Sequence, residues 1–321
     1  MTGLPLAVGA AAMAVGAAAL FTWQQRNRRY TSSASVAEAY DRWTNDQLLE
    51  NLWGEHIHLG HYATPPRPVG AVDFRQAKAA FVHELVRWSG LDQLPTGSRV
   101  LDVGCGIGGS ARILARDYGL DVLGISISPA QIARATALTP ASLPRCRFQV
   151  MDALDLTLAD GSFDAVWSVE ACPHMPDKQR YADELLRVLR PGGRLAVADW
   201  NRRDPAVRPL NRLERWVMHQ LLVQWAHPEF ASIPGFRRNL EASRYGAAGT
   251  LHVDTGDWSR ETLPSWIDSI LEGVRRPGAV LGLGPRAVLQ GLRETPTLLL
   301  MHWGFATGMM QFGVFRAVKP G

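Results

Sequence analysis

The chain has 321 residues, of which 46% are hydrophobic and 20% are charged, and its formal net charge is +4. This composition excludes a disordered polypeptide and a protein embedded wholly in a membrane, and it predicts a substantial core. Only three cysteines are present, which excludes a disulfide scaffold and a cysteine-rich zinc site. The basic residues are nearly all arginines scattered among acids, so we expect no nucleic-acid partner.

The first predicted element is a membrane anchor within residues 1–30. No charged side chain occurs from Gly3 to Trp23, a run long enough for a helix to span the ~30 Å hydrocarbon core. Three arginines follow by residue 29, and positive flanks stay on the cytoplasmic side. We therefore expect a single N-terminal helix in the lipid bilayer and a catalytic part on the cytoplasmic side. A cleaved signal peptide is the alternative, but no basic residue precedes the run.

Residues 31–95 are predicted to form a helical cap and substrate-access segment, and residues 96–200 an alternating core. Helical patterns cover 109–118, 129–138 and 177–190, and they separate apolar runs that end at Val103, Ile125, Met151, Val169 and Ala198. This alternation predicts an α/β fold with a central, mainly parallel sheet and helices on both faces.

Residues 201–250 are predicted to form a helical lid over the substrate, and residues 251–321 to complete the sheet and bind an apolar tail. The uncharged run from Thr295 to Phe315 predicts a buried helix over about 297–310 and a strand over about 312–318, with Gly313 at the break. A second membrane span is the alternative for this run. The sequence leaves three locations for the tryptophans at 216, 225, 258, 266 and 303: a channel for the tail, a lipid surface and the core.

A glycine-rich turn follows the first predicted strand. Gly104, Gly106 and Gly108, with Cys105 between them, allow a tight turn where a ligand can approach bare backbone at a helix N-terminus. Gly104, Gly106 and Gly109 also have the spacing of the dinucleotide fingerprint, which needs an acid at the end of the second strand. That position is Ser126, which argues against a nicotinamide enzyme.

Four further features, in this order and spacing, resemble the Rossmann-like class I methyltransferases. They are Asp102 before the first glycine, Met151-Asp152-Ala153 at the end of the third strand, the run 162–166 opening the fourth strand, and the run 185–193 leading into a fifth strand that ends at Asp199-Trp200. The resemblance implies S-adenosyl-L-methionine as the methyl donor and an antiparallel C-terminal strand.

Within that class, Ser126-Ile127 with Gln131 resembles the subgroup of tocopherol-pathway methyltransferases and cyclopropane fatty-acid synthases. There a hydroxyl side chain and a glutamine contact the ribose; the alternative is that Gln131 is an exposed helix residue. The cofactor-binding residues expected are Asp102, Gly104, Cys105, Gly106, Gly108, Ser126, Ile127, Gln131, Asp152, Ala153 and Glu170.

The similarity extends over nearly the whole sequence. The segments 40–44, 53–62, 170–178 and 198–201 resemble the γ-tocopherol methyltransferase family, and 225–233, 262–266 and 312–318 resemble its cyanobacterial prenyl-benzoquinol branch. This resemblance implies C-methylation of a prenylated hydroquinone, 2-methyl-6-phytyl- or 2-methyl-6-solanesyl-1,4-benzoquinol, in tocopherol and plastoquinone biosynthesis. It also implies a bacterial plasma or thylakoid membrane. Methylation of γ-tocopherol, or of a lipid in the manner of cyclopropane synthases, is the alternative.

Four histidines are candidates for the group that takes the phenolic proton, whose pKa is near ~10 in an ordinary phenol. His56 and His58 share a face if their segment is extended, and His61 then lies across from them. His174 follows the fourth strand, at the sheet edge where ligands bind. We expect His58 and His174 to be catalytic, with Glu55 as an orienting residue. No metal is expected, because methyl transfer from a sulfonium needs none.

Overall fold

The computed structural model describes residues 21, 23, 30–63, 72–246 and 250–321. The anchor predicted within residues 1–30 therefore lies almost wholly outside the described residues. Within the described part of the chain, no helix combines the length and the apolar character needed to cross a membrane.

Seven strands form one sheet in the order β3-β2-β1-β4-β5-β7-β6. Their bounds are β1 (Arg99–Val103), β2 (Asp121–Ser126), β3 (Cys146–Val150), β4 (Phe163–Val169), β5 (Leu189–Arg202), β6 (Val253–Asp257) and β7 (Met310–Val318). Strands β1 to β5 pair in parallel, and β7 runs antiparallel between β5 and β6. The predicted α/β sheet with an antiparallel C-terminal strand is confirmed. Strand β6 was not predicted, because only its first residue is buried and it shows no alternation.

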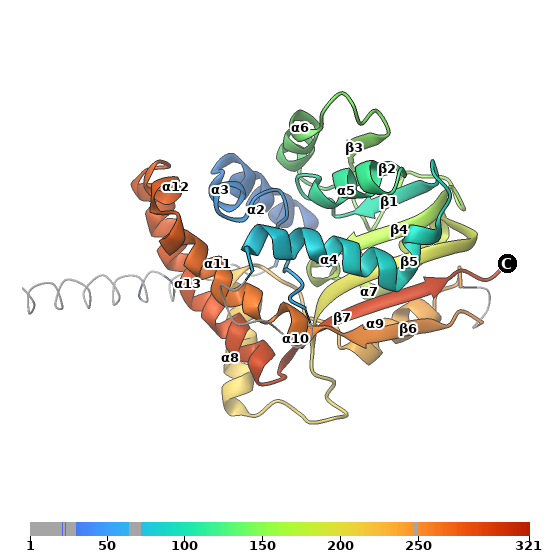
Figure 1. The fold of residues 1–321 in the computed structure, drawn as a ribbon. Coiled ribbons are helices and arrows are strands. Elements are labelled where there is room, and N and C mark those ends of the chain that lie inside the picture. The colour runs from blue at the N-terminus through green and yellow to red at the C-terminus, as the bar shows by residue number, and fades with distance from the viewer. Residues whose placement is uncertain (1–20, 22, 24–29, 64–71, 247–249) are drawn as a thin grey trace, which may run out of the picture.

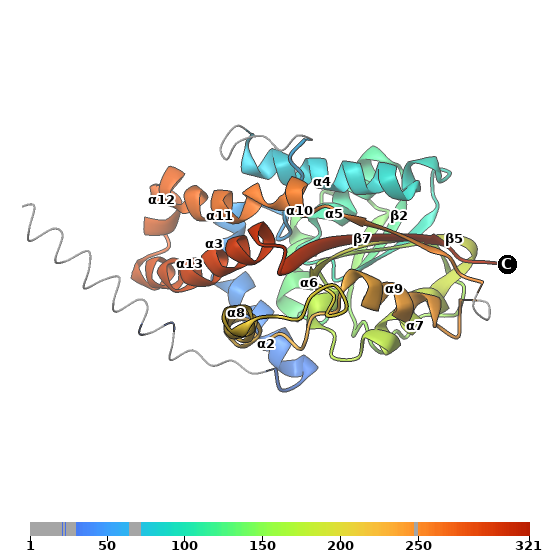
Figure 2. The same cartoon turned by 90° about the horizontal axis from the view of Figure 1, so that it is seen from below.

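Helices cover both faces of this sheet (Figure 2). On one face lie α4 (Phe74–Ser89) and α5 (Gly109–Asp117), and on the other lie α7 (Lys178–Val188) and α9 (Ile233–Glu241). Helix α6 (Pro129–Leu138) packs along β2 and β3. The helices predicted over 109–118, 129–138 and 177–190 are confirmed within two residues. Within the predicted lid, residues 201–250, α9 packs on α7 and β6, while α8 (Arg212–Gln224) packs on α13 (Pro285–Ala306).

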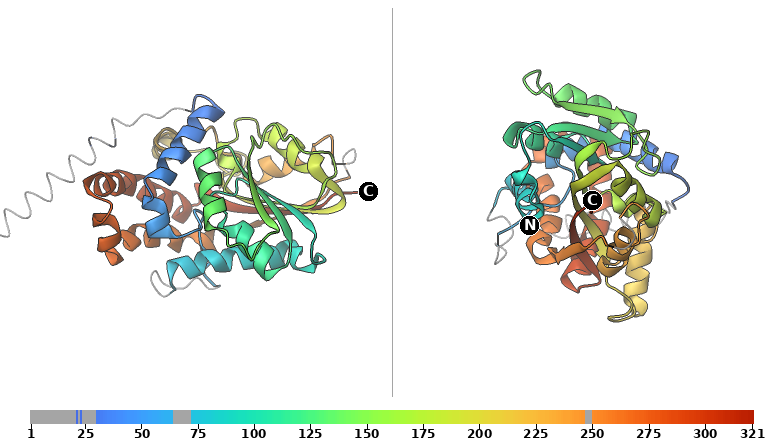
Figure 3. Two further views of the ribbon diagram at one scale, coloured as in Figure 1. Left: turned by 90° about the horizontal axis from the view of Figure 1, so that it is seen from above. Right: turned by 90° about the vertical axis from the view of Figure 1, so that its right-hand side faces the viewer.

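The remaining helices gather beyond the carboxyl edge of the parallel strands, at the end opposite the C-terminus (Figures 1 and 3). They are α2 (Ser33–Asn45), α3 (Leu48–Trp53), α8 (Arg212–Gln224), α10 (Ser259–Thr262), α11 (Pro264–Arg275), α12 (Pro277–Leu281) and α13 (Pro285–Ala306). Short 3-10 turns cover Leu91–Gln93 and Cys172–His174. We call this group of helices the helical end. It closes over the edge of the sheet where ligands bind in such folds.

The helix and strand predicted in the last uncharged run are present, but their junction was misplaced. Helix α13 begins at Pro285 and ends at Ala306, and the backbone turns at Gly308, whose φ is +67°. Gly313 instead lies inside β7, where an added Cβ would sit 2.2 Å from Asn201 Oδ1. Its small size therefore serves a close approach between strands and not a turn.

Trp23, at the end of the apolar N-terminal run, belongs to the folded body. Its side chain is buried, and its indole N–H donates to Thr297 Oγ1 on α13 at 2.9 Å. The Trp23 carbonyl accepts a hydrogen bond from Gln224 at the end of α8. The boundary predicted at residue 30 therefore falls too late in the sequence, since Trp23 already holds α8 and α13 together.

Candidate active site

A cavity opens at the carboxyl ends of β1, β2 and β4, where the strand order reverses. Its walls come from the turn after β1, the ends of the strands, and helices α2, α3 and α13. All the predicted cofactor-binding residues line it except Gly108, whose added Cβ would meet Phe148 at 2.6 Å. The three residues predicted to be catalytic, His58, His174 and Glu55, also line the cavity.

The turn after β1 presents bare backbone to this cavity. The amides of Gly104 and Cys105 both donate to the Ile125 carbonyl at 2.9 Å, which ties the turn to β2. A Cβ on Gly104 would meet Ala171 at 2.6 Å, so glycine is required there by packing. A Cβ on Gly106 would meet nothing within 4 Å, although Gly106 lines the cavity. The open space over Gly106 fits a ligand that approaches the main chain.

Two carboxyl groups are buried in the cavity wall. Burial raises the pKa of Asp102 to about 7, and one of its carboxylate oxygens has no hydrogen-bond partner among the described residues. Burial raises the pKa of Glu170 to about 8, and a hydrogen bond from the Leu59 amide at 2.7 Å opposes that rise. Glu170 also has a φ of +56°, a strained conformation of the kind that clusters at functional sites. These two carboxyl groups fit a ligand that carries positive charge, as S-adenosylmethionine does.

These raised pKa values predict that cofactor binding releases protons. A positively charged ligand favours the ionised carboxylates of Asp102 and Glu170 and lowers their pKa, so each binding event releases part of a proton near pH 7. Affinity is therefore expected to rise from about pH 6 to pH 8. Calorimetry in two buffers with different heats of ionisation measures the release. Asp102→Asn should reduce it, and equal heats in both buffers would contradict the expectation.

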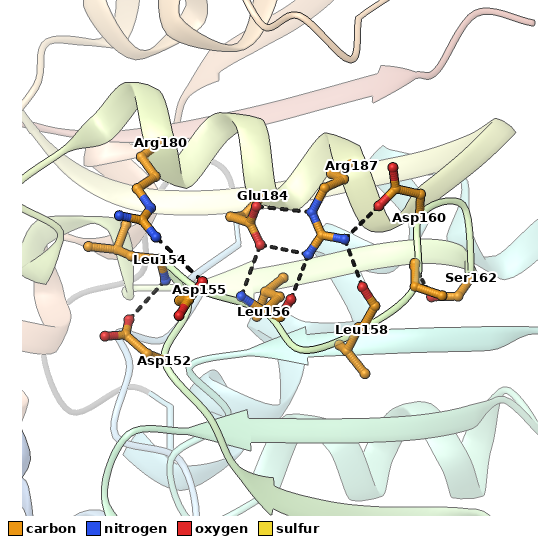
Figure 4. A network of polar contacts seen from close by, with 11 residues as sticks. Asp152, Leu154, Asp155, Leu156, Leu158, Asp160, Ser162, Arg180, Glu184 and Arg187 are labelled. Atoms are coloured by element: carbon orange, nitrogen blue, oxygen red, sulfur yellow. Dashed lines mark hydrogen bonds and ion pairs between the residues drawn. The ribbon is translucent and has the colours of Figure 1, made fainter.

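Asp152 is held at the cavity by the loop after β3. Its Oδ1 accepts a hydrogen bond from the Leu154 amide at 2.9 Å. Further along the loop, Arg187 on α7 donates to the Leu156 and Leu158 carbonyls at 2.7 Å, and Glu184 accepts from the Leu156 amide (Figure 4). Helix α7 thus fixes the loop, and with it the position of the Asp152 carboxyl group.

Asp152→Ala is expected to weaken S-adenosylmethionine binding by ~1–3 kcal/mol, the usual cost of leaving a buried donor unpaired. The matched control is Asp155→Ala, three residues along the same loop, whose exposed carboxylate pairs only with Arg180 among the described residues. Calorimetry should find the control unchanged. Equal losses in both variants would assign the effect to the loop and not to a contact of Asp152.

Ser126 and Gln131 come together as the subgroup resemblance implies. Ser126 Oγ donates to Gln131 Oε1 at 2.7 Å, and both side chains line the cavity. Ser128 caps α6 by accepting from the Gln131 amide at 3.1 Å, which fixes the glutamine at the start of the helix. Gln131 is 4% exposed, so the alternative of an exposed helix residue is wrong.

The two ring nitrogens of His58 are already occupied. Because a carbonyl only accepts, His58 Nδ1–H donates to the Leu59 carbonyl at 2.8 Å. The remaining lone pair at Nε2 then accepts from His56 Nδ1 at 3.1 Å, which confirms that the two histidines share a face. Burial lowers the pKa of His58 to about 3. The Glu55 carboxylate bonds to Arg112 at 2.7 Å, so the geometry gives no support to its orienting His58.

His174 is differently placed. Its Nε2 lies 2.6 Å from the Tyr40 hydroxyl, while its Nδ1 is buried without a hydrogen-bond partner among the described residues. Burial lowers the pKa of His174 to about 3, so the ring is neutral at pH 7. His61 does not line the cavity. Its ring packs against Trp258, with the two ring centroids 5.2 Å apart.

His227, which was not predicted from the sequence, completes the group. Its ring lies 4.3 Å from the His174 ring, centroid to centroid. Burial lowers the pKa of His227, and a hydrogen bond to the Pro173 backbone opposes this. That bond needs a ring N–H, while Nδ1 has no partner among the described residues, so Nδ1 carries the lone pair. The signal available in the sequence was its place in the segment 225–233, which carries the family resemblance.

Fold and site together define a class I, Rossmann-like methyltransferase: the strand order, the open glycine turn and the carboxyl groups at the strand ends meet in one cavity. Residues 101–197 match the family described as "Methyltransferase domain". The fold is similar to geranyl diphosphate C-methyltransferase from Streptomyces coelicolor, solved with S-adenosyl-L-homocysteine. That similarity has a TM-score of 0.63 and 20% identity, over 89% of this chain and 97% of that one.

Two relatives are similar over almost the full length. The 2-methyl-6-phytyl-1,4-hydroquinone methyltransferase of Synechocystis sp. is 56% identical over 91% of this chain and 90% of that protein. The chloroplastic tocopherol O-methyltransferase of Arabidopsis thaliana is 32% identical over 89% of this chain and 82% of that protein. The chain belongs to the family of S-adenosylmethionine-dependent methyltransferases that contains these two enzymes, as the sequence resemblance predicted.

Proposed function

We propose that this enzyme methylates a ring carbon of a prenylated hydroquinone, 2-methyl-6-phytyl- or 2-methyl-6-solanesyl-1,4-benzoquinol, in tocopherol and plastoquinone biosynthesis. The relative of 56% identity carries a hydroquinone methyltransferase name, which supports this substrate class. The observation that carries the proposal is the two-part character of the cavity. Its polar part lies at the strand ends, and its apolar part is lined by Leu48, Leu49, Trp53, Trp225, Trp266 and Leu298.

The polar and apolar parts of the cavity match the hydroquinone ring and the prenyl tail of such a substrate. His174 and His227 lie where they meet, next to Trp225 and Trp200. A phenolic ring held there places a hydroxyl near an imidazole lone pair, while a prenyl tail follows the apolar wall. The indole N–H of Trp225 is satisfied by Glu294 on α13 at 2.8 Å, so its ring face remains available for apolar contact.

S-adenosylmethionine, when bound, supplies a methyl group activated by a sulfonium. The protein's own residues align the ring, exclude water and take up the phenolic proton. His227 Nδ1 is the candidate acceptor, because its lone pair has no hydrogen-bond partner among the described residues, while that of His58 is engaged by His56. Loss of that proton makes the ring carbon beside the hydroxyl electron-rich, which is the nucleophile that the reaction requires.

Labelled S-adenosylmethionine and a panel of acceptors test the function. The panel holds the phytyl and solanesyl hydroquinones, γ-tocopherol and an unsaturated phospholipid, and the product is analysed for the methylated atom. We expect carbon methylation of the first two and little or no turnover of the others. Turnover confined to γ-tocopherol or to the phospholipid would overturn the proposal in favour of the respective alternative. At limiting S-adenosylmethionine, the enzyme with Gly106→Val serves as the control with weakened cofactor binding.

The membrane anchor predicted within residues 1–30 is part of this proposal, because a prenyl tail resides in the bilayer. Since Trp23 packs between α8 and α13, the informative deletion removes residues 1–20 only. The shortened protein is expected to bind S-adenosylmethionine normally and to lose activity on tailed substrate in vesicles. A short-tailed, detergent-dispersed analogue should still be methylated. Unchanged activity on vesicles would contradict the anchor.

A further inference from the structure

Helix α13 has two opposite faces with different surroundings. Gln290, Glu294 and Leu298 follow one another at intervals of four residues, and all three line the cavity. At roughly 100° per residue, the opposite face consists only of apolar residues. They are Pro285, Leu289, Leu292, Pro296, Leu299 and Trp303.

Among the described residues, no side chain covers the leucines of this outer stripe, whereas Trp303 is partly buried against the core. Leu289, Leu292 and Leu299 are 42%, 41% and 48% exposed. A helix at a water-facing surface normally carries polar residues on that side. The neighbouring helix α8, which packs against α13, adds exposed Leu213 and Trp216. Exposed apolar surface of this extent marks a binding surface.

The charges around the stripe are positive. Arg286 and Arg293 lie on its flank, and the one acid of α13, Glu294, is bonded to Trp225. Arg275 and Arg276 are paired with Asp268 and Glu272 and do not add to this charge. Residues 205–220 contain three arginines against one acid, Glu214, which is buried. Leucine and tryptophan bordered by arginine is the pattern of helices that lie in the interface of an anionic membrane.

We infer that the outer face of α13, with α8 beside it, rests on the surface of an anionic lipid bilayer. Its leucines lie at the boundary of headgroups and acyl chains, and the arginines lie among the lipid phosphates. The apolar N-terminal run ends beside these two helices, because the buried Trp23 is held by Thr297 of α13 and by Gln224 of α8. A single helix then separates the lipid from the cavity.

This surface is distinct from the proposed N-terminal anchor, and its test needs no substrate. A cysteine at Leu292 in the full-length protein is labelled with an environment-sensitive fluorophore, and the protein is placed in vesicles. The matched control is a cysteine at Val318, which is 52% exposed near the C-terminus, at the opposite end of the molecule (Figure 1). The three native cysteines are buried, and the unmutated protein measures their background labelling.

With vesicles that contain phosphatidylglycerol, we expect the probe at 292 to shift to the blue and to be quenched by brominated acyl chains. The probe at 318 should show neither change. Quenching at 292 should be at least about twofold stronger than in pure phosphatidylcholine, and it should weaken as salt is added.

Three results would overturn the inference. The first is a membrane-bound protein whose probe at 292 stays unquenched, which would leave only the anchor in contact with lipid. The second is equal quenching at 292 and 318. The third is a blue-shifted probe at 292 before lipid is added, which would mean that protein covers the stripe. Dependence of that shift on protein concentration would then identify a second copy, and independence would identify the protein's own N-terminal segment.

Discussion

Gly106→Val is expected to weaken S-adenosylmethionine binding by roughly 10- to 100-fold. The valine side chain would occupy space that the bound cofactor needs, and forcing an extra side chain into a filled site costs ~1–3 kcal/mol. The space that the valine would occupy is open in the structure and lies inside the cavity. The sheet should stay folded, since nothing else lies within 4 Å of the added Cβ. Calorimetry measures the affinity, and circular dichroism checks the fold.

The control for this variant must carry the same backbone strain. Gly308→Val does so: Gly308 has a φ of +67° against +54° for Gly106, and an added Cβ there also meets nothing within 4 Å. Gly308 does not line the cavity. Its affinity for the cofactor should therefore be unchanged. Equal weakening in both variants, or none in either, would show that the turn after β1 does not hold the cofactor.

His174→Ala and His227→Ala are expected to slow the methyl-transfer step by ~10²–10⁴-fold, the typical effect of losing a general base. Single-turnover experiments at saturating cofactor isolate this step. His58→Ala is the matched control, because His58 is an equally buried imidazole whose two nitrogens are occupied by Leu59 and His56. We expect it to alter the apparent substrate affinity more than the rate.

The pH dependence separates a base from a positioning residue. Burial holds the pKa of His174 near 3 and lowers the pKa of His227, so both imidazoles stay neutral and the rate should be flat between about pH 5 and 8. At higher pH, hydroxide ionises the ring hydroxyl and should partly restore the alanine variants. A rate that rises through pH 6.5 would contradict the buried, neutral state. Variants that remain slow at high pH would have lost a positioning contact.

The sequence predicted the elements that local patterns specify. Helices α5, α6 and α7 start within one residue of the predicted positions, because glycine, proline or a capping side chain marks each start. Strand β6 was missed because an edge strand with one buried residue shows no period of two. The start of α13 was also missed, since Pro296 lies inside the helix, where proline usually marks an end.

The candidate site was predicted well where one motif holds its residues together. The glycine turn, Asp152 and the pair Ser126–Gln131 are each local in the sequence, and all of them reach the cavity. The histidines depended on tertiary contacts that the sequence does not display. His227 reaches His174 from a segment more than fifty residues away, and a hydrogen bond to His56 occupies His58.

If the apolar N-terminal run is the proposed membrane anchor, the position of Trp23 limits the distance between the catalytic cavity and the bilayer. Trp23 is the last residue of the apolar run, and Tyr30, seven residues later, lines the cavity. Seven peptide units join them, so these two residues lie at most ~25 Å apart even if the backbone between them is fully extended. This tether is shorter than the ~30 Å hydrocarbon core itself. With the proposed anchor in place, a substrate would present its ring to the cavity while much of its tail remained in the lipid, so full extraction from the membrane would not be required.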